Sequence, residues 1–141
     1  MLQDSGEGVT HTISVYEGYA VRNAIERTNY AGRIVTGHLQ KLLNERGYRV
    51  SHEISREIKE KLCFVTLQYE ATNSSYYDKT YELPDGQLLT IGEERFRSTE
   101  PLFCPAMAGI EGLGIHEMVY KTIMKSDIDM RKVSFIVEKE V

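Results

Sequence analysis

The chain has 141 residues, a length that suits one globular domain, and 41% of them are hydrophobic, which is enough for a packed core. Its formal net charge is −4, with acids and bases scattered along the chain, so it lacks the basic stripe typical of nucleic-acid binding. We find no apolar run long enough to cross a bilayer and no leader-like N-terminus, so we expect no membrane partner and a soluble protein inside the cell.

The first part of the chain predicts strands followed by a helix. Residues 10–21 are rich in β-forming side chains and are interrupted by a Glu-Gly pair, which indicates two strands, or one strand and a turn. Residues 31–46 place apolar side chains at helical spacing. Thr36 is the candidate cap for the start of this helix, and Gly47 is expected to end it.

A second helix is predicted over residues 51–62, where apolar residues recur at intervals of four. Ser51 and Ser55 are its candidate caps, and its charged face is expected to be solvated. Residues 72–78 form a polar stretch rich in turn-forming residues and without core side chains.

The last part of the chain predicts a hairpin, a helix and a closing strand. Residues 79–96 carry Pro-Asp-Gly between two β-rich runs, which is a hairpin signal. Residues 114–127 have a helical apolar pattern and precede a short helical piece at 128–132. The β-prone sequence at 133–137 is expected to be a strand, so the layout is mixed α/β.

The two cysteines, Cys63 and Cys104, are interpreted as reduced thiols, because the chain has no secretory signal. Neither has metal-ligand spacing to a histidine. Cys63 lies in an apolar run, where a small core side chain is the favoured interpretation over a catalytic thiol.

Residues 4–11, DSGEGVTH, have the composition of a loop that holds an anion. Glycines let the backbone approach a polyanion closely, and successive N–H groups of a tight turn can point at phosphate oxygens. Acidic residues beside them would repel phosphate unless a divalent cation lies between. Taken alone, the same residues equally suit a simple turn between two strands.

Ten segments in order resemble actin over residues 4–132. They are DSGEGVTHT, VYEGYA, AGR, ERGY, REIKEKLC, YELPDGQ, TIG, ERFR, GIHE and SDIDMRK. Between RGY and IKEKL the chain is several residues shorter than actin. The resemblance implies a partial actin-like (ribonuclease H-like) ATPase domain of the α/β class, with a mixed sheet, flanking helices and a β-hairpin. Residues 1–141 would be an incomplete second large domain, covering much of subdomains 3 and 4.

The resemblance also implies ATP or ADP with Mg²⁺ as the ligand. Asp4 would face the magnesium through water, in keeping with the hydrated coordination that Mg²⁺ prefers, and His11 would order the attacking water. The loop around the phosphates would consist of Gly6, Glu7, Gly8 and Val9. Glu7 stands where actins usually have aspartate.

Four further residues are implied at the nucleotide. Gly32 resembles the residue beside the ribose, while Arg56, Lys59 and Glu60 resemble a helix face beside the adenine and ribose. Their spacing of three or four residues puts them on one face of a helix. From the sequence alone, an ordinary solvated charged face is the alternative.

Three segments resemble the filament contacts of actin. Their residues are Pro84, Asp85, Gly86, Met107, Ala108, Asp127, Asp129 and Arg131. Met107 and Ala108 replace a bulkier aromatic and aliphatic tip. Without the resemblance, the hairpin would be read as an edge turn and the last segment as a helix cap.

The functional hypothesis is an actin-like cytoskeletal fragment with an ATP-binding half-cleft, filament-contact segments and a structural or binding role in the cytoplasm. Its expected partners are other actin-like subunits or actin-binding proteins. No glycine-rich phosphate loop with a lysine precedes Asp4, so nucleotide binding by these residues alone is expected to be weak or absent. Two alternatives stay open, namely a small ATPase, and an actin-related subunit of a larger complex whose partner supplies the missing half.

Overall fold

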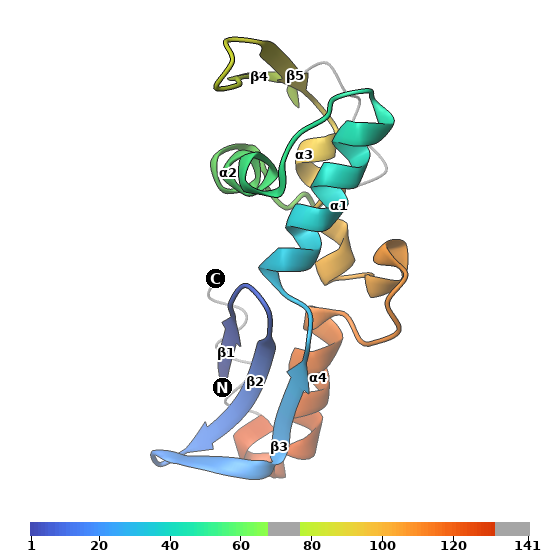
Figure 1. Ribbon diagram of the computed structural model, residues 1–141. Coiled ribbons are helices and arrows are strands. Elements are labelled where there is room, and N and C mark those ends of the chain that lie inside the picture. Colours follow the sequence, from blue (N-terminus) through green and yellow to red (C-terminus); the bar gives the residue numbers. More distant parts are fainter. Residues whose placement is uncertain (68–76, 132–141) are drawn as a thin grey trace. The chain divides into compact units, whose positions relative to one another are not determined.

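The computed structural model describes residues 1–67 and 77–131, which divide into two compact units. The first unit contains residues 1–32 and 111–131, and the second contains residues 33–110. Each unit combines a small antiparallel sheet with helices, as Figure 1 shows. This arrangement confirms the expected mixed α/β class.

The first unit is built on a three-stranded sheet in the order β1-β2-β3. The strands are β1 (Leu2–Ser5), β2 (Thr10–Tyr16) and β3 (Tyr19–Thr28). Between β2 and β3, Glu17 and Gly18 both have positive φ angles, 49° and 83°. Two positive φ angles are typical of the tight hairpin turn that matches strand twist. The prediction of two strands at this place is therefore confirmed.

The expected mixed sheet is wrong for the described residues, because all strand pairs there are antiparallel. Consecutive strands in both sheets are joined by short turns, whereas a parallel pair needs a crossover connection of about a dozen residues or more. The strand expected at residues 133–137 and most of the polar stretch at 72–78 lie outside the described residues.

Helix α4 (Ile115–Lys125) packs against β2 and β3 (Figure 1). Of the residues with apolar spacing, Met118, Thr122 and Ile123 are buried on its inner face, whereas Ile115 and Val119 are half-buried. Lys121 and Lys125 both form ion pairs with Glu26 of β3. The hydrogen bond from Lys125 lowers the pKa of Glu26, although partial burial opposes this shift. These contacts fix the helix on the sheet.

Helix α1 (Gly32–Glu45) begins four positions before the predicted cap. Thr36 is buried inside the helix, so its assignment as the cap is wrong. The helix therefore covers nearly the whole of the predicted range, 31–46. The end of the helix is as predicted: Gly47 has a φ of 91°, and the Tyr48 N–H donates to the Leu43 carbonyl over 3.0 Å.

Helix α2 (His52–Leu62) is capped by Ser51, whose Oγ accepts a hydrogen bond from the Ile54 N–H over 3.3 Å. Ser55, the other candidate cap, is buried one turn further along. Its hydroxyl donates to the Ser51 carbonyl over 2.9 Å, so it does not cap the helix. Of the two serines, only Ser51 precedes the first helical residue, where N–H groups need an acceptor.

The predicted hairpin is confirmed by β4 (Lys79–Glu82) and β5 (Leu88–Ile91). At its turn, Gly86 has a φ of 83°, and the Leu83 N–H donates to the Gln87 carbonyl over 2.8 Å. Three short helical segments follow, namely α3 (Glu94–Arg97), η3 (Glu100–Leu102) and η4 (Pro105–Ala108).

The hydrophobic core of the second unit joins α1, α2 and the hairpin. Its buried members are Leu39, Leu43, Val50, Ile58, Leu83, Leu89 and Ile91. Cys63 packs against this cluster, and the Ser98 hydroxyl lies 3.3 Å from its sulfur. Burial raises the pKa of the Cys63 thiol, which disfavours the reactive thiolate. Cys63 is thus a partly buried side chain at the edge of the core, which favours the packing interpretation over a catalytic thiol.

Candidate functional site

The glycine-containing loop of the first unit is a tight turn between β1 and β2. The Gly6 N–H donates to the Val9 carbonyl over 3.1 Å and closes the turn. The Gly6 carbonyl accepts a hydrogen bond from the Gly32 N–H over 3.0 Å. The loop is thus tied to the start of α1, and two of the predicted nucleotide residues that are distant in sequence, Gly6 and Gly32, are in direct contact.

Neither glycine of this loop is required by the packing of the chain itself. A Cβ atom on Gly8 would have no neighbour within 4 Å, and one on Gly6 would lie 3.9 Å from the Val9 carbonyl oxygen, an ordinary contact. Neither residue has the left-handed backbone that favours glycine. The two glycines therefore leave open space beside the backbone, as a loop that receives an external group would need.

A chain of hydroxyl groups holds the base of the loop. The Ser5 and Thr10 hydroxyl oxygens lie 2.9 Å apart, and the Thr10 hydroxyl donates to the Tyr30 carbonyl over 2.9 Å. The Tyr30 N–H in turn donates to the Thr28 hydroxyl over 3.1 Å. No sequence pattern predicts a role for these residues, since Ser and Thr in a strand carry no distinguishing signal. Their contacts join both ends of the loop to the segment before α1.

Asp4, His11 and Arg27 form a row across the three strands. Asp4 is paired with His11, and His11 is paired with Arg27. Side chains directly opposite each other on antiparallel strands lie on the same face, with Cβ atoms about 5 Å apart. The register therefore brings together a carboxylate, an imidazole and a guanidinium beside the loop. These polar groups can all hydrogen-bond to a water molecule.

The carboxylates near the loop fit a metal site only where the ligand brings most of the metal's coordination. Within residues 1–67 and 77–131, no group of three or more His, Cys, Asp or Glu side chains could hold a metal ion. Asp4 supplies one carboxylate, and Glu7 is exposed at the turn. Mg²⁺ usually keeps several waters and binds one or two carboxylates together with substrate phosphates. The residues present fit a magnesium ion that arrives with a nucleotide, and they do not fit a metal held by the protein alone.

The predicted base-contacting residues lie on α2, in the second unit. The Arg56 Nε is 3.0 Å from a Glu60 carboxylate oxygen, and both side chains are about half exposed. This contact confirms that Arg56 and Glu60 share a helix face, and Lys59 is half-buried in the same helical turn. An exposed pair at this spacing contributes only about 0.3–0.5 kcal/mol to stability.

The hairpin tip that resembles a filament contact is exposed at Pro84, Asp85 and Gly86. The Asp85 carboxylate accepts a hydrogen bond from the Gln87 N–H over 2.9 Å, which stiffens the turn. A preformed, exposed turn is a feature that a protein partner can bind without ordering it first.

The other two predicted contact segments are also accessible. Met107 is 39% exposed on η4, and Ala108 beside it is half-buried. After α4, Asp127 and Asp129 are exposed, and the Asp127 carbonyl accepts hydrogen bonds from the N–H groups of the two residues that end the described chain, Met130 and Arg131. The short helical piece expected at 128–132 is described through residue 131.

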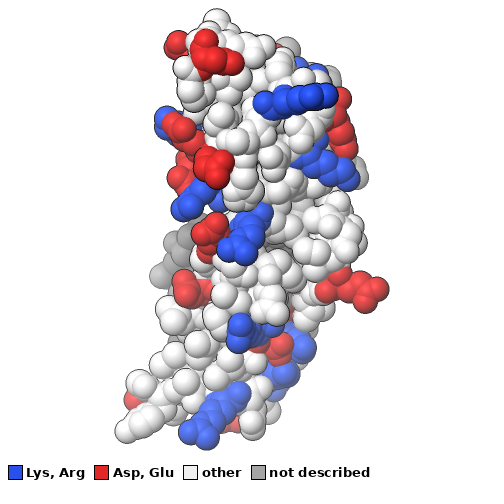
Figure 2. Space-filling view, in the orientation of Figure 1, with Lys and Arg blue, Asp and Glu red and all other residues white. Residues whose placement is uncertain are grey.

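Charged side chains of both signs are interspersed on the face shown in Figure 2. Among the described helices, none combines the length and the apolar character that crossing a membrane requires.

One comparison with known proteins bears on these residues. A family model described as Actin matches the chain over residues 1–53 and 48–136. The two matches overlap at residues 48–53, around the start of α2. Together they include the β1–β2 loop, α1, α2, the hairpin and α4.

Proposed function

This chain belongs to the actin family, and from that premise we propose that its β1–β2 loop binds the phosphates of ATP or ADP with Mg²⁺, while its exposed segments contact other actin-like subunits. We further propose that the two units are parts of the ribonuclease H-like fold of actins, the first belonging to subdomain 3 and the second to subdomain 4. The observation that carries the nucleotide proposal is the open space at Gly6 and Gly8.

In this proposal the backbone of the loop approaches the phosphates where a Cβ would otherwise intrude. The N–H groups of a tight turn act as fixed donors toward anionic oxygens. Magnesium, when bound with the nucleotide, supplies the positive charge that offsets the phosphates. Asp4 orients the waters around that charge, and His11, its neighbour across the strands, orients a water at the terminal phosphate.

The remaining nucleotide residues have supporting roles. Gly32 holds the loop through its N–H, which donates to the Gly6 carbonyl, and its resemblance to actin is what supports a place beside the ribose. On α2, the Arg56–Glu60 pair and Lys59 offer charged groups to the ribose and adenine. Exchange of a solvent-exposed pair for ligand contacts is expected to give specificity more than affinity.

The proposed role is structural, as a subunit of a cytoskeletal actin-like assembly in the cytoplasm. The hairpin tip, η4 and the segment after α4 would contact neighbouring subunits or actin-binding proteins. Each offers exposed side chains on a short, hydrogen-bonded backbone segment.

We expect the 141-residue chain to bind ATP weakly and only with Mg²⁺. Isothermal titration calorimetry should give a dissociation constant above about 10 μM, since half a cleft can hardly supply the roughly −8 kcal/mol of micromolar binding. Gly8→Ala should reduce the affinity further, by about tenfold, because the added methyl enters the space proposed for phosphate. Its thermal unfolding should not change, as that methyl meets no atom of the chain.

Gly37→Ala is the matched control, because Gly37 is another glycine whose Cβ would meet nothing within 4 Å and it lies in the second unit. It should leave ATP binding unaltered. Submicromolar binding that is indifferent to Mg²⁺, or equal effects of the two alanines, would contradict the phosphate-loop proposal.

We expect no ATP turnover above background by the same chain. Phosphoryl transfer needs positioning and charge stabilisation from both sides of the phosphate, and these residues include one candidate phosphate loop. Steady-state phosphate release should match the rate of a protein-free blank, for the unmodified chain and for His11→Ala alike. Turnover that disappears in His11→Ala would instead favour the small ATPase, and turnover restored by a second chain would favour the subunit of a larger complex.

A further inference from the structure

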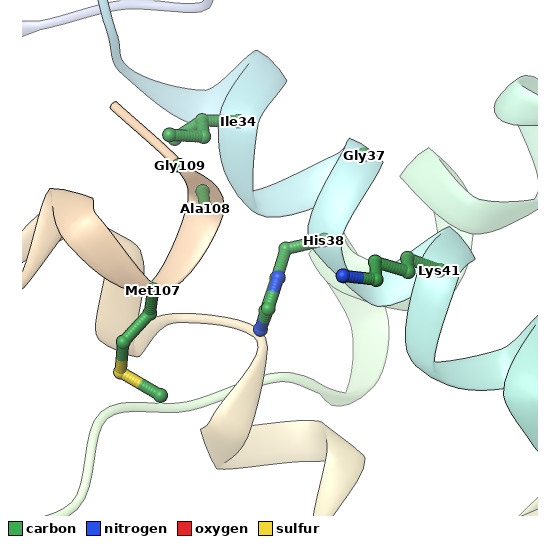
Figure 3. Close-up of a pocket in the computed structure, with 7 residues that line it drawn as sticks. All are labelled: Ile34, Gly37, His38, Lys41, Met107, Ala108 and Gly109. Carbon is green, nitrogen blue, oxygen red and sulfur yellow. The ribbon is translucent and has the colours of Figure 1, made fainter. Parts of the chain in front are cut away.

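A pocket of about 380 Å³ opens within the second unit, between α1 and η4 (Figure 3). Helix α1 contributes Ile34, Gly37, His38 and Lys41 to its wall, and η4 contributes Met107 and Ala108. Its volume lies within the range of about 300–1,000 Å³ that is usual for small-molecule sites. None of its α1 residues has a role in the function proposed above.

The pocket is cationic at one end and apolar at the other. Figure 3 shows the Lys41 side chain extending toward the His38 ring, with Met107, Ala108 and Ile34 on the other side. In the described part of the chain, Lys41 forms no ion pair, so its charge is available to a ligand. A site with one cation and an apolar wall suits a monoanion with an aliphatic tail.

His38 is a neutral donor at this site. Burial lowers its pKa, as do the charges of Lys41 on α1 and Arg97 on α3, while Glu45 on α1 acts in the opposite direction. A histidine with a pKa below its usual value is uncharged at neutral pH. Its ring can then donate one N–H to an anion, and a bound anion would raise its pKa again.

Gly37 is a further observation, independent of the charges, that favours ligand binding in this pocket. It lies in the interior of α1 with no left-handed backbone, and a Cβ there would meet nothing within 4 Å. Glycine inside a helix is less favourable than alanine by about 0.5–1 kcal/mol. The fold therefore loses stability at this position without any packing reason, and the missing methyl widens the pocket.

We propose that this pocket binds a medium-chain aliphatic carboxylate, with the carboxylate between Lys41 and His38 and the tail against Ile34, Met107 and Ala108. The inference is independent of nucleotide binding. It rests on the shape of the pocket, the charge at one end and the unexplained glycine.

The test is titration of the chain with sodium octanoate, followed by calorimetry and by NMR of the His38 ring protons. Octanoate should bind saturably and at least about tenfold more tightly than acetate, which lacks the tail, or octylammonium, which reverses the charge. The pKa of His38 should rise when octanoate is bound. Lys41→Met should reduce the affinity for octanoate by about tenfold or more.

Gly37→Ala distinguishes an effect on octanoate binding from an effect on stability, because affinity and stability should change in opposite directions. Its thermal unfolding temperature should rise, while its affinity for octanoate should fall by several-fold. Gly8→Ala, in the first unit, should alter neither quantity. The proposal is wrong if octylammonium binds as well as octanoate, or if Lys41→Met and Gly37→Ala both leave octanoate binding intact.

Discussion

Replacing Leu39 with alanine is expected to lower the free energy of unfolding of the second unit by about 2–5 kcal/mol. Leu39 lies on α1 with no solvent exposure, and it belongs to the cluster that joins both helices to the hairpin. Truncation removes buried apolar surface and leaves a cavity that rigid neighbours such as Ile58 and Ile91 fill only in part.

Urea denaturation followed by far-UV circular dichroism measures this change, since the chain has no tryptophan to report by fluorescence. Leu88→Ala is the matched control. Leu88 is 63% exposed on the hairpin, and its truncation should change the free energy of unfolding by less than about 0.5 kcal/mol. Similar losses for the two variants would show that the core is not where the structure places it.

Arg46→Met is expected to destabilise the second unit by about 3 kcal/mol. One guanidinium nitrogen of Arg46 lies 3.0 Å from a Glu94 carboxylate oxygen and 3.1 Å from the Thr90 carbonyl. The Glu94 side chain is only 7% exposed, and its other oxygen accepts from the Gly92 N–H over 3.0 Å. Loss of the guanidinium leaves a buried charge with a single hydrogen-bond partner.

Two further variants test whether the unpaired Glu94 carboxylate causes the loss of stability in Arg46→Met. Combining Arg46→Met with Glu94→Gln should restore about half of the stability, because the neutral amide is cheaper to bury than an unpaired carboxylate. Arg56→Met, which breaks the exposed pair on α2, should have an effect of about 0.5 kcal/mol or less. Equal effects of Arg46→Met and Arg56→Met in chemical denaturation would rule out a buried-charge mechanism.

Local sequence patterns predicted the structure correctly where one or two residues determine the backbone conformation. The Glu17-Gly18 turn, the helix end at Gly47 and the hairpin turn at Gly86 depend on positive φ angles, which glycine adopts readily. Ser51 caps α2 because its side chain can reach the Ile54 N–H without help from the rest of the protein. Such features need only a few neighbouring atoms, so composition and spacing suffice to predict them.

Predictions failed where packing overrides a local preference. Thr36 is a plausible cap by residue type, yet it lies buried inside α1, because the helix begins at Gly32. The expectation of a mixed sheet failed for residues 1–67 and 77–131, because short turns join the consecutive strands there and make every pair antiparallel.

By itself, the sequence determined the chemistry of the candidate site: two acids, two glycines and a histidine within eight residues, in an order that resembles actin. Only the tertiary structure placed Asp4 directly across from His11, joined Gly32 to Gly6, and left the space beside Gly8 empty. The pocket between α1 and η4 was likewise invisible in the sequence, since its walls are about 70 residues apart along the chain. Residue identity sets which groups are available, whereas strand register and helix packing set which of them meet, because those depend on contacts between segments distant in sequence.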